Sequence, residues 1–241
     1  IFSDQNRQQC FQKLCHMTGP LNLPSSLKEI GNNAFYFCSK LTGDINIPNG
    51  VTSIGFQAFI ECTGFDGKFI IPATVTSIGE AAFSKCINLQ SIEIPQTVTA
   101  IEKLAFSGCS SLTGDLIILQ KSGTLTLPTN LVSIGSRSFQ RTNFNCQLIL
   151  PQTLTTIKSS AFSSSSFNGE LNLPSNLEII EYSAFRNCYG FTGSLNIPDS
   201  VTKITKESFS GCSRFNGTLN IPKTVSSIED CAFYGCSGFT G

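Results

Sequence analysis

The amino-acid sequence predicts a repeat solenoid, mainly β with short 3₁₀ or helical turns. Three observations support this fold class. A proline follows an apolar-x-apolar triplet nine times along the chain, an isoleucine stands six residues after each of these prolines, and a phenylalanine follows each isoleucine by five residues. A period of this length is the signature of an array in which one structural unit stacks on the next. We therefore expect nine coiled turns.

The spacing of the prolines defines the turns. They are separated by 24, 24, 23, 33, 23, 23, 24 and 24 residues, so the unit is 23–24 residues long. A unit of this size cannot bury its own apolar side chains, but stacking converts each buried position into a continuous column. The prolines are Pro24, Pro48, Pro72, Pro95, Pro128, Pro151, Pro174, Pro198 and Pro222.

Each unit also predicts its local structure. The triplet before the proline, as in Leu195-Asn196-Ile197, alternates apolar and polar residues as a half-buried strand does. Proline ends that strand because it has no N–H to donate. The β-branched segment at 51–54 indicates a second short strand. The segment from the isoleucine to the phenylalanine and beyond has room only for a helical or 3₁₀ turn, and a Gly-containing turn then leads into the next unit.

Three sets of apolar residues are expected to form buried columns, one of them the valine or leucine three residues after each proline. The second is the set of nine phenylalanines: Phe35, Phe59, Phe83, Phe106, Phe139, Phe162, Phe185, Phe209 and Phe233. The third is the set of isoleucines that includes Ile54, Ile78 and Ile101.

Seven of the 11 cysteines occupy one repeat position, three residues after the phenylalanine. Two other units place Thr142 and Ser165 there, and such exchange is typical of a packing position and not of a required disulfide or metal ligand. Buried free cysteine behaves as a small apolar residue. The seven are Cys38, Cys62, Cys86, Cys109, Cys188, Cys212 and Cys236.

The four remaining cysteines are Cys10, Cys15, Cys146 and Cys231. Cys10 and Cys15 could form a disulfide in an N-terminal cap, and Cys231 could meet a neighbour in the last turn. Because the total is odd, at least one thiol is free or intermolecular. Cys10 and Cys15 with His16 are the one cluster that suggests a metal, and we expect no metal site there because zinc needs two close pairs of ligands.

Two segments depart from the repeat. Residues 1–19 resemble a degenerate first unit or cap, and residues 20–241 form the array, with an irregular insertion near 115–124. The array stops at a unit boundary without a polar cap, and we expect the natural protein to continue beyond it. The insertion is consistent either with a binding feature or with tolerated drift.

The composition excludes several classes of function. Lys+Arg and Asp+Glu both total 16, so the chain lacks the basic stripe that binding to nucleic acid requires. No apolar run reaches the roughly 18 residues that a membrane-spanning helix needs. With one histidine, no tryptophan and no recurring pair of carboxylates, the sequence predicts neither enzyme activity nor a cofactor.

Candidate binding residues come from breaks in an otherwise regular surface. The centre of the strand before the proline is asparagine in five of nine units, and those side chains could form a ladder. The pattern changes between about 68 and 150, which marks a stretch where a partner could bind, although a purely structural origin of the change stays open. The candidates are Lys68, Ile70, Glu93, Thr126 and Ile149.

The repeat resembles a known family. Residues 47–55, Ile-Pro-Asn-Gly-Val-Thr-Ser-Ile-Gly, followed by Ala58-Phe59 and Cys62, are similar to the BspA-like leucine-rich-repeat family, and the resemblance covers residues 20–241. It implies a leucine-rich-repeat right-handed coil, found on the surfaces of oral and gut bacteria and of mucosal protozoan parasites. Members of the family are implicated in adhesion to host matrix proteins and epithelial cells and in co-aggregation.

The resemblance therefore implies an extracellular or cell-surface adhesion module whose partner is a host protein, without enzyme activity or cofactor. The motif residues of the family are structural, so no ligand-contacting residue can be transferred. A passive spacer that presents another domain is the alternative.

Overall fold

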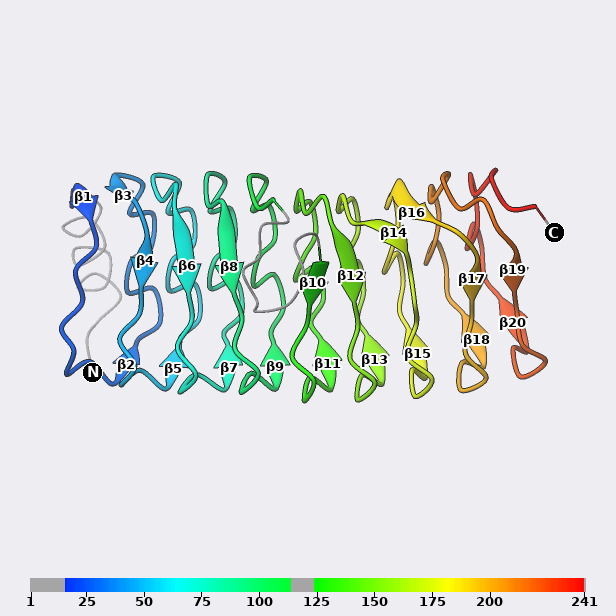
Figure 1. The fold of residues 1–241 in the computed structure, drawn as a ribbon, viewed down its shortest axis with the longest axis horizontal. Coiled ribbons are helices and arrows are strands. Elements are labelled where there is room, and N and C mark those ends of the chain that lie inside the picture. The colour runs from blue at the N-terminus through cyan, green and yellow to red at the C-terminus, as the bar shows by residue number, and fades with distance from the viewer. Residues whose placement is uncertain (1–15, 114–123, 241) are drawn as a thin grey trace.

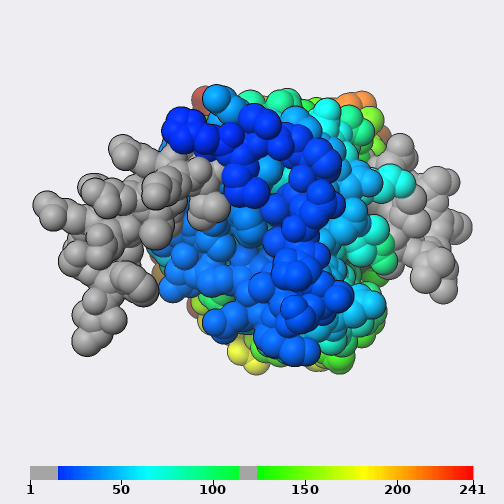
Figure 2. Space-filling model, turned by 90° about the vertical axis from the view of Figure 1, so that its left-hand side faces the viewer, coloured from blue at the N-terminus to red at the C-terminus, as the bar shows by residue number. Residues whose placement is uncertain are grey.

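The computed structural model describes residues 16–113 and 124–240, and these residues form one parallel β-solenoid (Figure 1). The chain coils through about nine turns of roughly 23 residues, and the described residues contain no helix. Viewed from the N-terminal end, successive turns lie behind one another along a single axis (Figure 2). The predicted solenoid is confirmed. The expected insertion near 115–124 and residues 1–15 of the expected cap lie outside the described residues.

One ladder of strands contains seven of the nine triplets that precede the prolines. It comprises three sheets of parallel strands, ordered β4-β6-β8, β10-β12-β14-β16 and β17-β19. The strands are β4 (Ile45–Asn46), β6 (Lys68–Ile70), β8 (Ser91–Glu93), β10 (Thr124–Thr126), β12 (Gln147–Ile149), β14 (Asn168–Glu170), β16 (Gly190–Thr192), β17 (Leu195–Asn196) and β19 (Leu219–Asn220). Of these, β14 and β16 come before the triplets of their turns, at 171–173 and 195–197. At the N-terminal corner β1 (Gly19–Pro20) pairs with β3 (Leu41–Thr42).

A second ladder contains the β-branched segments. A seven-stranded parallel sheet runs in the order β15-β13-β11-β9-β7-β5-β2, and β18 pairs with β20 beyond it. Its isoleucines pair with one another in register, for example Ile134 with both Ile101 and Ile157. The strands are β2 (Glu29–Ile30), β5 (Ser53–Ile54), β7 (Ser77–Ile78), β9 (Ala100–Ile101), β11 (Ser133–Ile134), β13 (Thr156–Ile157), β15 (Ile179–Ile180), β18 (Lys203–Ile204) and β20 (Ser227–Ile228).

The structure refines the expectation of short helical turns. The segment around Phe59 is a run of β-turns, closed by hydrogen bonds from Ala58 N to Gly55 O and from Cys62 N to Phe59 O. Gln57 and Glu61 have positive φ values of 52° and 54°, which reverse the backbone direction and prevent a continuous 3₁₀ helix. Alternate N–H groups are thereby free to bond the next turn, as Phe59 N does to Ala82 O at 2.7 Å. These bonds make a third ladder along the solenoid.

The phenylalanines form one uninterrupted stack inside the coil. All eight consecutive pairs are stacked, with ring centroids 4.9–5.6 Å apart. The pair Phe106–Phe139, at 5.5 Å, spans the 33-residue interval, so the insertion leaves the core register unchanged. The rings from Phe59 to Phe209 are fully buried, whereas Phe35 and Phe233, at the two ends, are partly buried. Ile54, Ile78 and Ile101 are also buried.

Candidate functional site

The most irregular part of the exposed strand surface lies on β6 and β8. These strands pair in parallel, so Lys68 lies opposite Ser91 and Ile70 lies opposite Glu93. Between them Phe69 and Ile92 point inward and are buried. The alternation of a pleated strand therefore places Lys68, Ile70, Ser91 and Glu93 together on the outer surface.

These side chains surround a shallow groove of about 220 Å³, which is lined by residues 68–70 and 91–93. Ile70 is 44% exposed, although it lies within a strand. Lys68 and Glu93 occupy diagonal positions across the strand pair, which are about 7–8 Å apart at the backbone. The groove thus has an ammonium group and a hydroxyl group on one cross-strand pair, and an aliphatic side chain and a carboxylate on the next pair.

The other two candidates lie elsewhere on the same surface. Thr126 and Ile149 pair directly on β10 and β12, which belong to a different sheet from β6 and β8. Both side chains are partly buried. The structure therefore brings Lys68, Ile70 and Glu93 into one groove and places Thr126 and Ile149 side by side on other strands. Sequence reasoning identified Lys68 but not Ser91, although the two residues occupy the same position on neighbouring strands.

The asparagines at the regular positions behave differently. On β17 and β19, Asn220 Nδ2 donates a hydrogen bond to Asn196 Oδ1 at 2.6 Å. This bond satisfies polar groups of neighbouring turns within the protein. The C-terminal part of the strand surface thus contains part of the expected asparagine ladder, whereas the groove on β6 and β8 presents an ammonium, an aliphatic chain and a carboxylate.

The cysteine position is occupied by buried free thiols. Six of the seven thiols, all but Cys38, donate to the carbonyl oxygen of the phenylalanine in the preceding repeat, as Cys86 does to Phe59 O at 3.1 Å and Cys109 does to Phe83 O at 3.0 Å. Burial raises the pKa of the Cys109 and Cys188 thiols to about 12, so both are neutral at physiological pH. Six of the seven cysteines at this position are buried, and the seventh, Cys236 in the last turn, is partly exposed.

The two substitutes at this position also form hydrogen bonds. Thr142 Oγ1 donates to Phe139 O at 2.8 Å, and Ser165 Oγ lies 3.5 Å from Cys188 Sγ. Cys146 is buried and Cys231 is exposed, both as free thiols, while Cys10 and Cys15 lie outside the described residues.

Within residues 16–113 and 124–240 there is no group of three or more His, Cys, Asp or Glu side chains that could hold a metal ion. The same residues contain no helix long and apolar enough to cross a membrane.

Comparison with known proteins identifies the family. The model of the BspA type leucine-rich repeat region, in six copies, matches residues 5–123, 67–192 and 119–240. The chain belongs to the BspA-type leucine-rich-repeat family. This is a family of surface proteins, and its leucine-rich-repeat solenoids are typically non-catalytic.

One solved structure with a similar fold agrees with this assignment. A leucine-rich repeat protein from Bacteroides ovatus is 26% identical, with a TM-score of 0.57 over 93% of this chain and 66% of that one. A leucine rich cell surface protein from Faecalibacterium prausnitzii is 27% identical, with a TM-score of 0.49 over 91% of this chain and 71% of that one. The chain therefore spans slightly less than two thirds of the Bacteroides structure. Among curated proteins, no sequence matches this chain.

Proposed function

We propose that this solenoid is a surface-displayed recognition module that binds a host matrix or cell-surface protein through the strand surface around β6 and β8. The observation that carries the proposal is the groove formed by Lys68, Ile70, Ser91 and Glu93. Exposed aliphatic surface bordered by polar groups is the usual anatomy of a protein–protein contact. Membership of a family of surface proteins supports a location where such a partner is accessible.

The small volume of the groove favours a protein partner over a small molecule. A groove of about 220 Å³ is smaller than most small-molecule sites, which occupy about 300–1,000 Å³. A loop from a partner could insert one apolar side chain beside Ile70 while pairing its own charges with Lys68 and Glu93. Affinity would then be the sum of contacts over several turns, with Thr126 and Ile149 as a second area farther along the surface.

The rival function is a passive spacer, and the regular surface on β17 and β19 favours it. The hydrogen bond between Asn220 and Asn196 is internal and needs no ligand. A spacer should present such internally satisfied positions along its full length. The groove on β6 and β8 breaks that uniformity, and this is why we place recognition first.

Surface plasmon resonance with the 241-residue chain tests the proposal against immobilised fibronectin, fibrinogen and epithelial-cell surface extract. We expect saturable binding that Ile70→Ser weakens about tenfold, as truncation of a central interface contact does. Lys68→Glu should weaken binding and change its salt dependence.

Matched controls are Lys28→Glu, an exposed charge reversal outside the groove, and Asn196→Ser on the regular surface. Both should bind like the parent. Saturable binding that is equally insensitive to all four variants would remove the groove from the site. No binding above an unrelated repeat protein would favour the spacer.

A further inference from the structure

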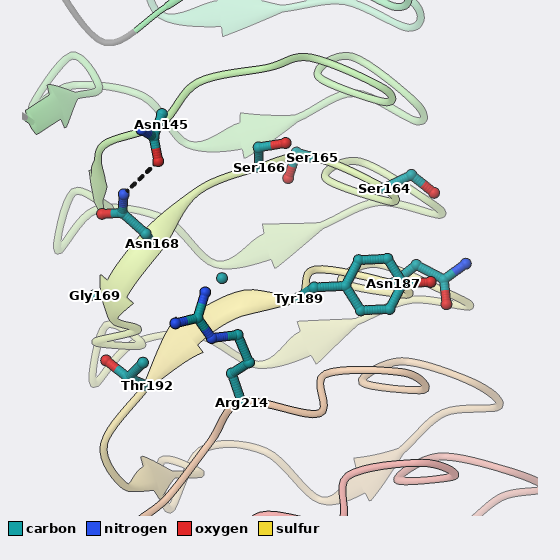
Figure 3. A pocket seen from close by; sticks show the side chains of 11 residues that line it. Asn145, Ser164, Ser165, Ser166, Asn168, Gly169, Asn187, Tyr189, Thr192 and Arg214 are labelled. Carbon is teal, nitrogen blue, oxygen red and sulfur yellow. Dashed lines mark hydrogen bonds between the residues drawn. The ribbon is translucent and has the colours of Figure 1, made fainter.

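A second, larger hollow lies on the other half of the solenoid, away from the groove on β6 and β8. Its volume is about 580 Å³, and it opens beside β14 and β16, among four successive turns (Figure 3). This volume falls within the range of about 300–1,000 Å³ that is typical of small-molecule sites. The residues that line it are polar or glycine, apart from the ring of Tyr189 and the alkyl part of Arg214.

The hollow arises where the length of the repeat changes. The turn that begins at Pro151 has 23 residues and the turn that begins at Pro174 has 24. One residue separates Ser165 from Phe167, whereas Tyr189 and Gly190 both separate Cys188 from Phe191. The stacked pair Phe144–Phe167 belongs to the shorter turns, and the stacked pair Phe191–Phe215 belongs to the longer ones. The added residue places Tyr189 outside the core at this step.

Tyr189 forms one side of the hollow with a largely free ring. It is 55% exposed, although it lies between the buried residues Cys188 and Phe191. Gly169 and Gly190 leave the adjacent backbone without side chains. An exposed aromatic ring beside an uncovered backbone offers a flat surface on which a ring-shaped ligand can pack.

Polar side chains line the remainder. Asn168 Nδ2 donates to Asn145 Oδ1 at 2.8 Å, which uses one half of each amide and orients the other halves (Figure 3). Ser164, Ser166 and Thr192 add hydroxyl groups that can both donate and accept. A ligand that covered these groups without hydrogen-bonding to them would be disfavoured by about 1–3 kcal/mol for each buried group. The lining therefore selects a ligand rich in hydroxyl groups.

The electrostatic character of the hollow is set by one cation. Arg214 is exposed, its guanidinium points toward Asn168 in the close view, and it is the single charged residue among those that line the hollow (Figure 3). The four ion pairs found among the described residues do not include it. A guanidinium group with no carboxylate beside it in the lining is suited to a bidentate pair with a ligand carboxylate. One cation is too few for a polyphosphate or a nucleic acid backbone.

From this arrangement we propose that the hollow binds a glycan whose exposed sugar carries a carboxylate. The pyranose ring packs on Tyr189, the amides of Asn145 and Asn168 bond the ring hydroxyls, and Arg214 pairs with the carboxylate. Both sialic acids and uronic acids present this chemistry. The site is separate from the protein-binding groove, because the hollow is lined by residues 145–214 and the groove by residues 68–93.

A glycan array probed with the 241-residue chain tests the proposal. The array carries sialylated glycans, uronate-containing glycans and the neutral counterpart of each, and titration calorimetry follows for the best ligand. We expect one acidic class to bind at least tenfold more tightly than its neutral counterpart. The class that does so identifies the source of the carboxylate.

Four variants locate the site. Arg214→Gln should lower affinity for the acidic glycan about tenfold and abolish its advantage over the neutral one, and Arg214→Lys should retain part of that advantage because charge persists without the planar fork. Tyr189→Ala should weaken acidic and neutral glycans alike, while Tyr189→Phe should not. Arg137→Gln and Tyr234→Ala are matched controls at exposed positions outside the hollow.

All positions are at the surface, and unchanged thermal midpoints would show that the variants remain folded. Equal binding of acidic and neutral glycans, an unaltered preference in Arg214→Gln, or no glycan binding at all would overturn the proposal. Lys68→Glu should leave glycan binding unchanged, so the failure of one site is distinguishable from the failure of the other.

Discussion

Replacement of Phe106 by alanine is the most direct test of the central stack. The ring of Phe106 is fully buried and lies between Phe83 and Phe139, each at a centroid distance of 5.5 Å. Removing a buried phenylalanine side chain typically costs about 3–5 kcal/mol, because apolar contacts are lost and a cavity remains. Two stacked contacts, each worth about 0.5–1.5 kcal/mol, place this position in the upper part of that range. We expect a loss of about 4 kcal/mol.

Urea unfolding followed by circular dichroism, under reducing conditions, measures the loss. With a dependence on urea of about 2–3 kcal/mol per molar, 4 kcal/mol shifts the midpoint by about 1–2 M. Phe233→Ala should cost less, about 2 kcal/mol, because that ring is partly buried and stacks on Phe209 at 5.6 Å at the end of the described stack. Phe56, which is 41% exposed, serves as the control, and its replacement should cost under about 0.5 kcal/mol.

The shape of the transition carries further information. Each turn contacts only its neighbours, so stability is approximately a sum of turn and interface contributions. A cavity at Phe106 weakens the junction between the turns on either side of the 33-residue interval, and the two halves should begin to unfold separately. A broadened or two-step transition is therefore expected in Phe106→Ala and not in Phe233→Ala. A midpoint that Phe106→Ala shifts no more than Phe56→Ala does would refute the stacking argument.

Three further predictions concern the thiols and the backbone. Alkylation of the native protein at pH 7.5, read by peptide mass spectrometry, should modify the exposed Cys231 quickly and the buried Cys109 only after denaturation, and rapid native modification of Cys109 would contradict the packing role. Burial raises the pKa of Cys109 and Cys188 to about 12 from 9.0, so the unfolded chain loses these protons first as the pH rises, and the free energy of unfolding should fall between about pH 9 and 12 by roughly 1.4 kcal/mol per pH unit for each thiol. The free energy of unfolding should fall less steeply across this range when both cysteines are replaced by serine. An identical slope would exclude the two thiols as the cause. Gly108→Ala should destabilise the protein by about 1 kcal/mol, because Gly108 has a φ of 74°. Gly31→Ala, with open space around its added methyl, should be neutral or stabilising by up to about 1 kcal/mol in the same urea assay. Equal effects of the two variants would argue against the positive φ as the cause.

The core was predictable from sequence because nine copies of each buried position report the same environment. Phe106 and Ile101 needed only their period to be placed. The backbone conformation between the isoleucine and the cysteine of each turn could not be predicted from a single unit, because residues such as Gln57 and Glu61 show no sign that they adopt positive φ. A signal did exist: three units place glycine, at Gly108, Gly211 and Gly235, where Glu61 stands, and all three have positive φ. Recognising this signal would have required a comparison of the same position in all nine units.

The two candidate sites also differ in whether the sequence could identify them. Lys68, Ile70 and Glu93 could be selected from sequence because they break a regular pattern, and parallel pairing then places them together. The hollow beside Tyr189 could not, because its cause is a change of one residue in the length of a turn. That change is visible as an interval of 24 after one of 23, but an interval does not say on which face the added residue projects. Sequence spacing fixes the register along the axis, while the outward direction depends on the turn geometry.

The architecture also decides how site substitutions should be interpreted. In each turn the stabilising interactions lie inside the coil, in the phenylalanine stack, the thiol–carbonyl bonds and the three hydrogen-bond ladders. Outward side chains such as Ile70 and Arg214 take no part in them, so their replacement should change stability by no more than about 0.5 kcal/mol. Coupling between turns passes only through nearest neighbours, so a change at β6 should not reach β14. A loss of binding in one region with an unchanged urea midpoint can therefore be attributed to that surface itself.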